Sequence, residues 1–340
     1  MKKELTLLLI ASFLTINLGC DLIDPPSAQV TLEKEIPETK LINEYTEETE
    51  LYFCPRQDCL TPTIQFLNSS NQSIHCALYD LSEESIIETL NEKSKSLDVK
   101  LVVDERYKED LLQYEFIRYD TSSQYSHNKF CIIDNKKIFT GSMNPTYNGL
   151  NKNNNNLILI NSKNLANNFE TEFQELWNGK FGKGQTNTQT HFTINNILYE
   201  QYFCPEDNCA NIIQKQIMSA NESIHFMTFS FTHGGIATDL AYQHQKGITI
   251  KGIYEKTQAG SQYSTFKILE YQGLDIKKDT NPKAMHHKVF IIDNQTVITG
   301  SMNPSKSGNE KNDENILIIH DKKITDLFLE EFNYIWNLED

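Results

Sequence analysis

The stretch HNKFCIIDNKKIFTGSMNP at residues 127–145 returns as HHKVFIIDNQTVITGSMNP at residues 286–304. Repeats on this scale decide the fold, because each copy has to be one structural unit. Two further pairs occur in the same order along the chain: YFCPRQDC (52–59) with YFCPEDNC (202–209), and NNNNLILI (153–160) with NDENILII (312–319). The second copy holds nine more residues than the first between its first strand and the long stretch.

Each copy alternates between strand and helix patterns. Short apolar runs rich in β-branched residues predict strands, and apolar residues at helical spacing predict the helices between them. The period is too long and the copies are too few for a solenoid, so we expect two duplicated α/β modules related by a pseudo-two-fold axis. In the first copy the predicted strands are 73–79, 99–103, 130–133, 138–140 and 157–160, and the predicted helices are 83–94 and 164–177.

The repeated stretch also carries the chemistry. Residues two apart on a strand project from the same face, so His127 and Lys129 present an imidazole and an ammonium side by side. His286 and Lys288 do the same in the second copy. Such a set contains two histidines, two lysines and nearby Ser and Asn side chains. It is suited to attack on a phosphorus atom that carries anionic oxygens. The Ser and Asn side chains are Ser142, Asn144, Ser301 and Asn303, placed after Gly141 and Gly300.

These motifs resemble those of the phospholipase D superfamily, which are H-x-K-x4-D followed by G-S-x-N. The resemblance covers roughly residues 50–340, and both copies match at every position. It implies an α/β fold with mixed central sheets flanked by helices and an active site at the interface of the two modules. The matching residues are His127, Lys129, Asp134, Gly141, Ser142 and Asn144, and His286, Lys288, Asp293, Gly300, Ser301 and Asn303.

The resemblance implies a mechanism without a metal or cofactor. One histidine attacks phosphorus to form a phosphohistidine, and the other protonates the leaving alcohol and then activates water. In such families the N-terminal histidine is generally the nucleophile, which assigns that role to His127 and the acid/base role to His286. The lysines and asparagines hold the phosphoryl oxygens. Asp134 and Asp293 belong to the motif, more as supports of its geometry than as substrate contacts.

One position breaks the symmetry of the two copies. Glu314 follows His286 at the same spacing at which Asn155 follows His127, so an acid in one copy corresponds to an amide in the other. The resemblance implies that a carboxylate here stabilises an imidazolium, which an amide cannot do. We therefore expect the two histidines to have different pKa values. The sequence leaves open which histidine Glu314 supports, and a surface acid is the alternative reading.

The N-terminus predicts export. Lys2 and Lys3 precede the apolar run 5–18, which ends at Gly19-Cys20 in a pattern similar to a bacterial lipoprotein signal. An acylated Cys20 would anchor the chain at the cell envelope; an uncleaved anchor or an ordinary secretory signal, with a secreted or periplasmic protein, is the alternative. No internal apolar run is long enough for a polytopic membrane protein. We divide the chain into an export signal (1–20), an acidic tether (21–50), a first module (51–195) and a second module (196–340).

The cysteines fit an oxidising compartment. Cys54 and Cys59, like Cys204 and Cys209, are predicted to pair locally, with a zinc site built from all four thiolates as the rival. Cys76 and Cys131 correspond to Phe226 and Phe290 in the second copy. This paired change predicts that the two positions are neighbours in each core, filled by a disulfide or by two buried thiols.

The sequence indicates the type of reaction more firmly than the substrate. The net charge of −15 disfavours a protein that coats nucleic acid, and a lipid anchor favours a substrate at the membrane. We therefore expect a phospholipase D-type phosphoric diester hydrolase acting on phospholipid headgroups, as a monomer. A metal-independent nuclease acting on DNA or RNA is the alternative, supported by a resemblance of residues 256–264 to small bacterial nuclease-like and cardiolipin-hydrolase-like proteins. A non-catalytic surface-binding protein is the remote one.

Overall fold

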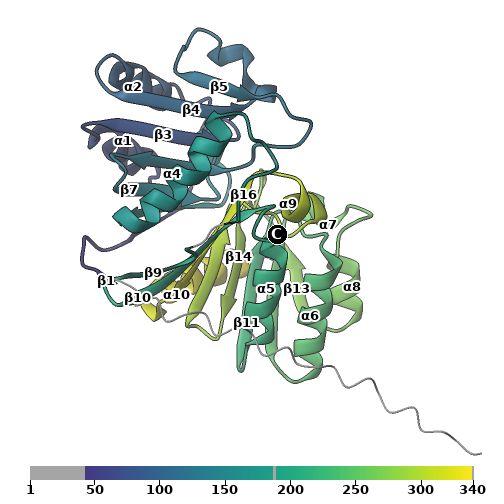
Figure 1. The fold of residues 1–340 in the computed structure, drawn as a ribbon. Helices are drawn as coiled ribbons and strands as arrows, with labels where there is room; N and C mark the ends of the chain where they lie inside the picture. The colour runs from purple at the N-terminus through teal and green to yellow at the C-terminus, as the bar shows by residue number, and fades with distance from the viewer. Residues whose placement is uncertain (1–42, 187–188, 339–340) are drawn as a thin grey trace, which may run out of the picture. The chain divides into compact units, whose positions relative to one another are not determined.

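The computed structural model describes residues 43–186 and 189–338, so the predicted export signal, Cys20 and most of the tether lie outside the described residues. Two mixed sheets form the framework, and their strand orders match element for element (Figure 1). The first is ordered β2-β8-β7-β6-β3-β4-β5 and the second β10-β16-β15-β14-β11-β12-β13, with β9 and β1 added beyond β10. The predicted fold of duplicated α/β modules is confirmed.

The five strands and two helices predicted for the first module agree with the structure to within about two residues at each end. The other elements of this module had no predicted range. Its strands are β2 (Glu50–Cys54), β3 (Ser73–Leu78), β4 (Asp98–Asp104), β5 (Ile117–Asp120), β6 (Lys129–Ile133), β7 (Lys137–Gly141) and β8 (Asn155–Asn161). Its helices are α1 (Leu60–Asn68), α2 (Glu84–Ser94), η1 (Glu105–Tyr107), η2 (Glu109–Leu111), α3 (Tyr147–Asn151) and α4 (Lys163–Trp177).

The second sheet repeats this plan and adds two short strands. Its strands are β1 (Asn43–Glu44), β9 (His191–Ile194), β10 (Ile197–Cys204), β11 (Ser223–Thr228), β12 (Thr249–Tyr254), β13 (Asp275–Lys278), β14 (Lys288–Ile292), β15 (Thr296–Gly300) and β16 (Glu314–His320). Its helices are α5 (Cys209–Met218), α6 (Gly234–Gln245), α7 (Lys256–Ala259), α8 (Phe266–Tyr271), α9 (Lys306–Glu310) and α10 (Lys322–Trp336). No helix in 43–186 or 189–338 is both long and apolar enough to cross a membrane.

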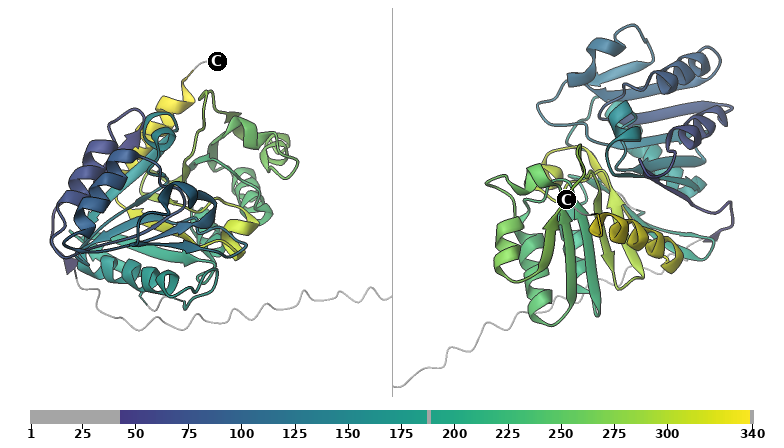
Figure 2. Two further views of the ribbon diagram at one scale, coloured as in Figure 1. Left: turned by 90° about the horizontal axis from the view of Figure 1, so that it is seen from above. Right: turned by 180° about the vertical axis from the view of Figure 1, so that it is seen from behind.

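Both faces of each sheet are covered by helices, which explains why central strands such as β6 and β14 are buried along their whole length rather than on alternate residues. In the first module α1 and α2 cover one face and α4 covers the other (Figures 1 and 2). Successive residues of β3 point to opposite faces, so Cys76 packs with α1 and α2 while Ala77 packs with α4. Phe169 and Phe173 on α4 anchor that second layer and are fully buried.

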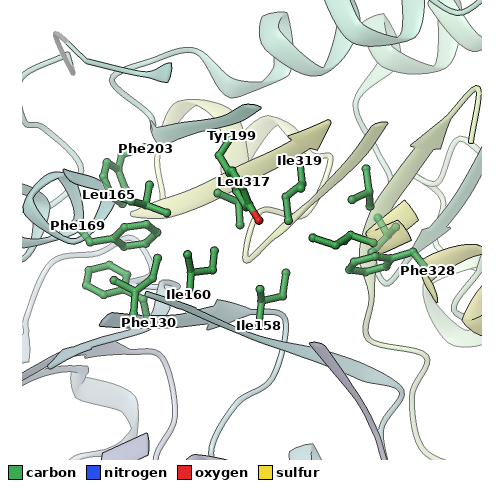
Figure 3. Packing of buried hydrophobic residues seen from close by; sticks show 14 of the residues in the cluster. Phe130, Ile158, Ile160, Leu165, Phe169, Tyr199, Phe203, Leu317, Ile319 and Phe328 are labelled. Carbon is green, nitrogen blue, oxygen red and sulfur yellow. The ribbon is translucent and has the colours of Figure 1, made fainter. Parts of the chain in front are cut away.

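The two modules share one hydrophobic core. Phe130, Ile158 and Ile160 from the first module lie opposite Leu317 and Ile319 from the second (Figure 3), and all five are at most 2% exposed. Burial of this continuous apolar layer fixes one module against the other, because separating them would expose it to water.

The predicted disulfides are present, and their sulfur atoms are bonded within each half: Cys54–Cys59, Cys204–Cys209 and Cys76–Cys131. The four-thiolate zinc alternative is therefore not formed. Cys76 lies directly opposite Cys131 in the β3–β6 pairing, as Phe226 lies opposite Phe290 in β11–β14. The prediction that these positions are neighbours is confirmed in both modules.

The end of the predicted tether is part of the folded body. β1 pairs with β9 in the second sheet, and Glu44 accepts hydrogen bonds from Ser162 Oγ and from the backbone N–H of Asn164 at the start of α4. Residues 43–50 thus connect the two sheets, which the acidic, Pro-containing sequence did not indicate. The second sheet also reaches back across the expected boundary after residue 195, since β9 pairs with β10.

One ion pair at the interface between the modules has no equivalent at the pseudo-symmetric position of the same interface. Arg56 Nε donates to Glu331 Oε2 at 2.8 Å, and Glu331 on α10 is fully buried. The equivalent residues on the other side are Glu206 and Glu172, both acids. Burial raises the pKa of Glu172 well above its usual range, aided by Asp313 and Glu206, and burial also raises that of Glu206.

We predict that Glu206→Arg stabilises the protein at neutral pH. The pKa values of Glu172 and Glu206 are higher in the folded than in the unfolded protein. The contribution of such acids to the free energy of unfolding is fully present at low pH and is lost as the pH rises through the folded-state pKa. Replacing one acid by a cation at this partly buried site should therefore increase the free energy of unfolding by about 1–2 kcal/mol at pH 7.5, with a smaller gain at pH 4.5. Urea unfolding at the two pH values measures it.

The matched control is Arg56→Glu, which places two acids on the other side as well. It leaves Glu331 buried without its cation and should cost about 3 kcal/mol at pH 7.5. An Arg at position 206 that leaves the stability unchanged or lowers it at pH 7.5 would show that the acidic side carries no unfavourable charge.

Candidate active site

The motif residues lie where strands of both sheets end. β4 and β5 run parallel to β3, so their carboxyl ends meet at one edge of the first sheet, and the chain returns from β5 to β6 through His127. β7 ends at the same edge with Gly141, whose φ of +133° and close approach to the Asn156 carbonyl oxygen exclude a side chain. His286 and Gly300 are placed identically in the second module.

Each histidine segment pairs with the other module. The backbone N–H of His127 donates to the Asp313 carbonyl oxygen at 2.9 Å, and that of His286 donates to the Asn154 carbonyl oxygen at 2.9 Å. Asp313 and Asn154 directly precede the strands β16 and β8. The two motifs are thereby held at the interface, as expected from the resemblance.

Glu314 supports the histidine of the opposite module. His127 Nδ1 and Glu314 Oε2 are 2.7 Å apart, and Ser301 Oγ donates to the same oxygen at 2.7 Å. Asn312 Nδ2 donates to Glu314 Oε1 at 3.4 Å, and the Glu314 side chain is fully buried. The question that the sequence left open is answered: the acid in the second copy serves the first copy's histidine, and the surface reading of Glu314 is wrong.

The other histidine has the mirrored arrangement with an amide in place of the acid. His286 Nδ1 lies 2.9 Å from Asn155 Oδ1, and Ser142 Oγ donates to that oxygen at 3.1 Å. An amide oxygen only accepts, so His286 donates its Nδ1 proton there and directs Nε2 toward the site. The two predicted serines therefore position the acceptors of the histidines.

Both lysines are buried beside their histidines. Lys129 Nζ donates to the His127 carbonyl oxygen at 2.7 Å, and Lys288 Nζ donates to that of His286 at 2.7 Å. An aromatic ring backs each pair: Tyr79 lies 4.8 Å from the His127 ring, and its centroid is 5.2 Å from Lys129 Nζ. Phe229 has the same two distances in the second module. Sequence reasoning missed these rings, although the alignment of the two copies, which matches one ring with the other, carried the signal.

The site disfavours charge in the absence of an anion. Burial lowers the pKa of both histidines, and the neighbouring lysines lower it further. Burial lowers the pKa of Lys129 to about 7 and, together with Lys129, lowers that of Lys288. Burial raises the pKa of Glu314 to about 8. An anionic phosphate between the lysines would favour their charged forms, so the geometry suits a ligand that brings negative charge with it.

Asp134 and Asp293 do not reach the histidines. Asp134 accepts from the backbone N–H groups of Asn71, Gln72 and Ser73 at 2.7–3.1 Å, at the far end of the β3–β6 pair. Asp293 makes the same bonds in the second module, to the N–H groups of residues 221–223. These bonds hold the turn that starts β3 or β11, which is a way of supporting the motif's geometry rather than of contacting substrate.

Asn144 and Asn303 follow the serines at the same edge and are half-buried. Each side-chain Oδ1 is enclosed without a hydrogen-bond partner in the described part of the chain. Their role in holding phosphoryl oxygens stays a prediction.

A second set of polar contacts joins the modules behind the histidines. Asn315 accepts from Thr140 Oγ1 at 3.1 Å and donates to Asn128 Oδ1 at 2.8 Å. Asn128 lies between His127 and Lys129 in the sequence, so this bond fixes the strand that carries both. In the mirrored set Asn156 accepts from Thr299 and contacts His287 Nδ1 at 3.1 Å.

Both modules match one known protein family. Residues 63–177 and 213–336 both match the family described as "Cardiolipin synthase, PLD-like domain". The chain therefore belongs to this family of phospholipase D-like proteins, as the motifs indicated.

Relatives found by sequence match one part of the chain, whereas one solved structure matches both modules. A phospholipase D of Rickettsia prowazekii is 31% identical over 130 residues, which is 38% of this chain and 63% of that protein. Human mitochondrial cardiolipin hydrolase is 30% identical over 122 residues, covering 36% of this chain and 48% of that protein. The crystal structure of phosphatidylserine synthase from Haemophilus influenzae aligns over 86% of this chain and 87% of its own, with a TM-score of 0.68 and 13% identity. This last likeness shows the two-module fold.

We predict that Glu314→Gln lowers kcat/KM for a phosphodiester by about 10²-fold, because an amide cannot stabilise an imidazolium at His127. The pH profile should change as well. Glu314 raises the pKa of Lys129, so removing its charge lets that lysine lose its proton at lower pH. If Lys129 holds phosphate as an ammonium, the alkaline limb of kcat/KM should then move to lower pH.

The control adds Asn155→Asp to the Glu314→Gln variant, which restores the charge but places it against His286. We expect no rescue. Full recovery would show that the position of the acid is unimportant and that the two histidines are interchangeable.

Proposed function

We propose that this protein is a metal-independent phosphodiesterase that cleaves phospholipid headgroups, in the manner of a phospholipase D, through a covalent phosphohistidine. The observation that carries the proposal is the pair of buried histidines, one from each module, whose Nδ1 atoms contact unlike partners, Glu314 and Asn155. A nucleophile and an acid need different environments.

In the first step His127 Nε2 attacks phosphorus and forms a P–N bond. Glu314 accepts the hydrogen bond from Nδ1 and stabilises the positive charge that develops on the ring. The bond from phosphorus to the headgroup oxygen breaks, and His286, protonated on Nε2, gives its proton to the departing alkoxide. The products of this step are a free alcohol and a phosphatidyl group on His127.

In the second step His286, now neutral, accepts a proton from a water molecule that attacks phosphorus. The P–N bond breaks, phosphatidic acid leaves, and both histidines return to their first states. Lys129, Lys288, Asn144 and Asn303 hold the non-bridging oxygens in both steps and stabilise the pentacoordinate transition state.

Three features support a phospholipid rather than a nucleic acid. The relatives described above are named phospholipase D and cardiolipin hydrolase. The chain has a net charge of −15, which repels a polyanion. The N-terminal sequence predicts export with an acylated Cys20, and the three disulfides fit an oxidising compartment. A lipid anchor would raise the local concentration of phospholipid around the site.

The test incubates the purified full chain in EDTA with phospholipid vesicles and, separately, with single-stranded DNA and RNA. We expect release of headgroup alcohol and phosphatidic acid that is unaffected by the chelator. Shortened polynucleotide with intact lipid would establish the nuclease alternative. Loss of activity in EDTA with recovery in zinc would contradict the two-histidine mechanism.

The control variants are His127→Ala, His286→Ala and the double variant. Each single change should remove nearly all turnover, and the double variant should be hardly worse, because the two residues act as one unit. Independent, additive losses would show that the histidines do not share one reaction.

A further inference from the structure

A buried histidine stands directly beside the proposed acid/base residue and has no part in the reaction as described so far. His287 lies between His286 and Lys288, which share one face of the strand, so the His287 side chain projects from the opposite face. It is fully buried in the interface behind the active site. Burying a polar ring costs free energy unless its nitrogen atoms are paired, so the contacts of these two atoms show what the residue does.

One nitrogen of the ring is held by the first module. Asn156 Nδ2 donates to His287 Nδ1 at 3.1 Å, while Asn156 Oδ1 accepts from Thr299 Oγ1 at 3.1 Å. An amide nitrogen only donates, so Nδ1 accepts and the proton of the neutral ring is on Nε2. Asn156 on β8 therefore sets the tautomer of a histidine in the other module.

The other nitrogen of the ring faces a buried carboxylate. His287 Nε2 lies 3.6 Å from Glu331 Oε1, and neither atom has a hydrogen-bond partner in the described part of the chain. Both side chains are fully buried. The second oxygen of Glu331 accepts from Arg56 Nε at 2.8 Å. The distance of 3.6 Å is longer than a hydrogen bond, but it aims a donor at an acceptor inside a closed interior.

These contacts form one row across the interface, which alternates between the modules. It begins at a side chain that is 32% exposed and ends beneath the active site. The interface row consists of Arg56, Glu331, His287, Asn156 and Thr299. It connects the surface of the first module with the strand that carries His286.

The pseudo-symmetric position has only part of this row. Asn128 Oδ1 accepts from Asn315 Nδ2 at 2.8 Å, which mirrors the bond from Asn156, whereas Asn128 Nδ2 is buried without a partner in the described residues. The arm that leads through a carboxylate to an arginine is therefore confined to the His286 side. The equivalents of Arg56, Glu331 and His287 are Glu206, Glu172 and Asn128.

This difference corresponds to the unlike partners of the two catalytic histidines. His127 contacts the carboxyl group of Glu314, while His286 contacts the amide of Asn155. A carboxylate binds an imidazolium more strongly than an amide does. The place of His286 therefore depends more on the backbone that carries it, and the interface row holds that backbone from behind.

We propose that His287 is a positioning residue for the acid/base histidine, and that Glu331 and Arg56 act through it on His286. The inference rests on the proposed function, in which His286 gives a proton to the leaving alcohol and then takes one from water. His287 acts by placing its neighbour and does not contact substrate. Disruption of the interface row should therefore slow the steps that need His286 more than it slows the attack by His127.

The test uses the variant His287→Asn in the full chain, because asparagine is the residue at the equivalent position of the first module. Its side-chain oxygen can still accept from Asn156, as Asn128 accepts from Asn315, but the side chain is too short to reach Glu331. The variant thus removes one arm of the interface row and keeps the other.

The soluble diester bis(4-nitrophenyl) phosphate separates the two chemical steps, because its good leaving group departs without a proton from His286. We expect kcat and KM of the variant to fall together by about tenfold, while kcat/KM, which reports the first step, stays within about twofold of the parent. A rapid release of about one 4-nitrophenol per chain should precede the slow turnover. With phosphatidylcholine vesicles, whose leaving alcohol needs the proton, kcat/KM should also fall about tenfold.

The matched control is His225→Asn. His225 lies on β11 of the same sheet, and its ring packs at 4.9 Å against Phe332 of α10, next to Glu331. The control removes a histidine ring from a contact with the same helix and should leave all the kinetic constants unchanged. Glu331→Gln should give the pattern of His287→Asn in weaker form, and the double variant should be hardly worse than His287→Asn, because both belong to one row.

The conservative variant His287→Gln, whose amide nitrogen can donate towards Glu331, should restore kcat to within about threefold of the parent. Equal losses of kcat and kcat/KM on the soluble diester in His287→Asn overturn the positioning role, since they show a general loss of active protein. Unchanged kinetics on both substrates, or a loss of the same pattern in His225→Asn, also overturn it. A parent protein that hydrolyses neither diester refutes the proposed function itself.

Discussion

The active site depends on one contact between modules: the 2.7 Å hydrogen bond between His127 in the first and Glu314 in the second. Both side chains are buried, and neither could keep its partner if the modules separated. Within the folded protein, loss of either partner would leave the other buried and unpaired at a cost of several kcal/mol, so the site is complete only when both modules contribute to it. The shared core behind them provides the apolar burial that holds this arrangement.

Duplication explains how such a site can be both symmetric and asymmetric. The framework is the same in both modules, including the backbone hydrogen bonds from His127 to Asp313 and from His286 to Asn154. Single replacements on that framework then differentiate the two sides. Asn155 in place of an acid makes one histidine unlike the other, and Arg56, whose counterpart is Glu206, gives the interface an ion pair on one side only.

The sequence predicted much of this because duplication supplies an internal comparison. The strands and helices of the first module were recognisable from periodicity, and the paired exchange of Cys76 and Cys131 for two phenylalanines correctly placed two residues 55 positions apart side by side. Motif spacing identified both histidine–lysine pairs. These are properties of local pattern or of aligned copies, which a linear sequence records.

Contacts that depend on how the modules meet could not be obtained in this way. Nothing local to Glu314 indicates that it crosses to His127, because the crossing follows from the packing of two sheets. The motif also does not show which backbone groups Asp134 holds, because the turn before β3 is more than sixty residues away in the sequence. The short strand β1 was not predicted for a similar reason. A two-residue strand shows no periodicity, and β1 pairs only with a strand that is distant in the sequence.

The central claim is that unlike partners make His127 the nucleophile and His286 the acid. The most direct measurement uses the His286→Asn variant with a diester that has a good leaving group, followed by peptide mapping of the acid-labile adduct by mass spectrometry. We expect one phosphoryl group on His127, trapped because no base remains to activate water. An adduct found on His286 in the unmodified protein, or none on His127 in the variant, would contradict it.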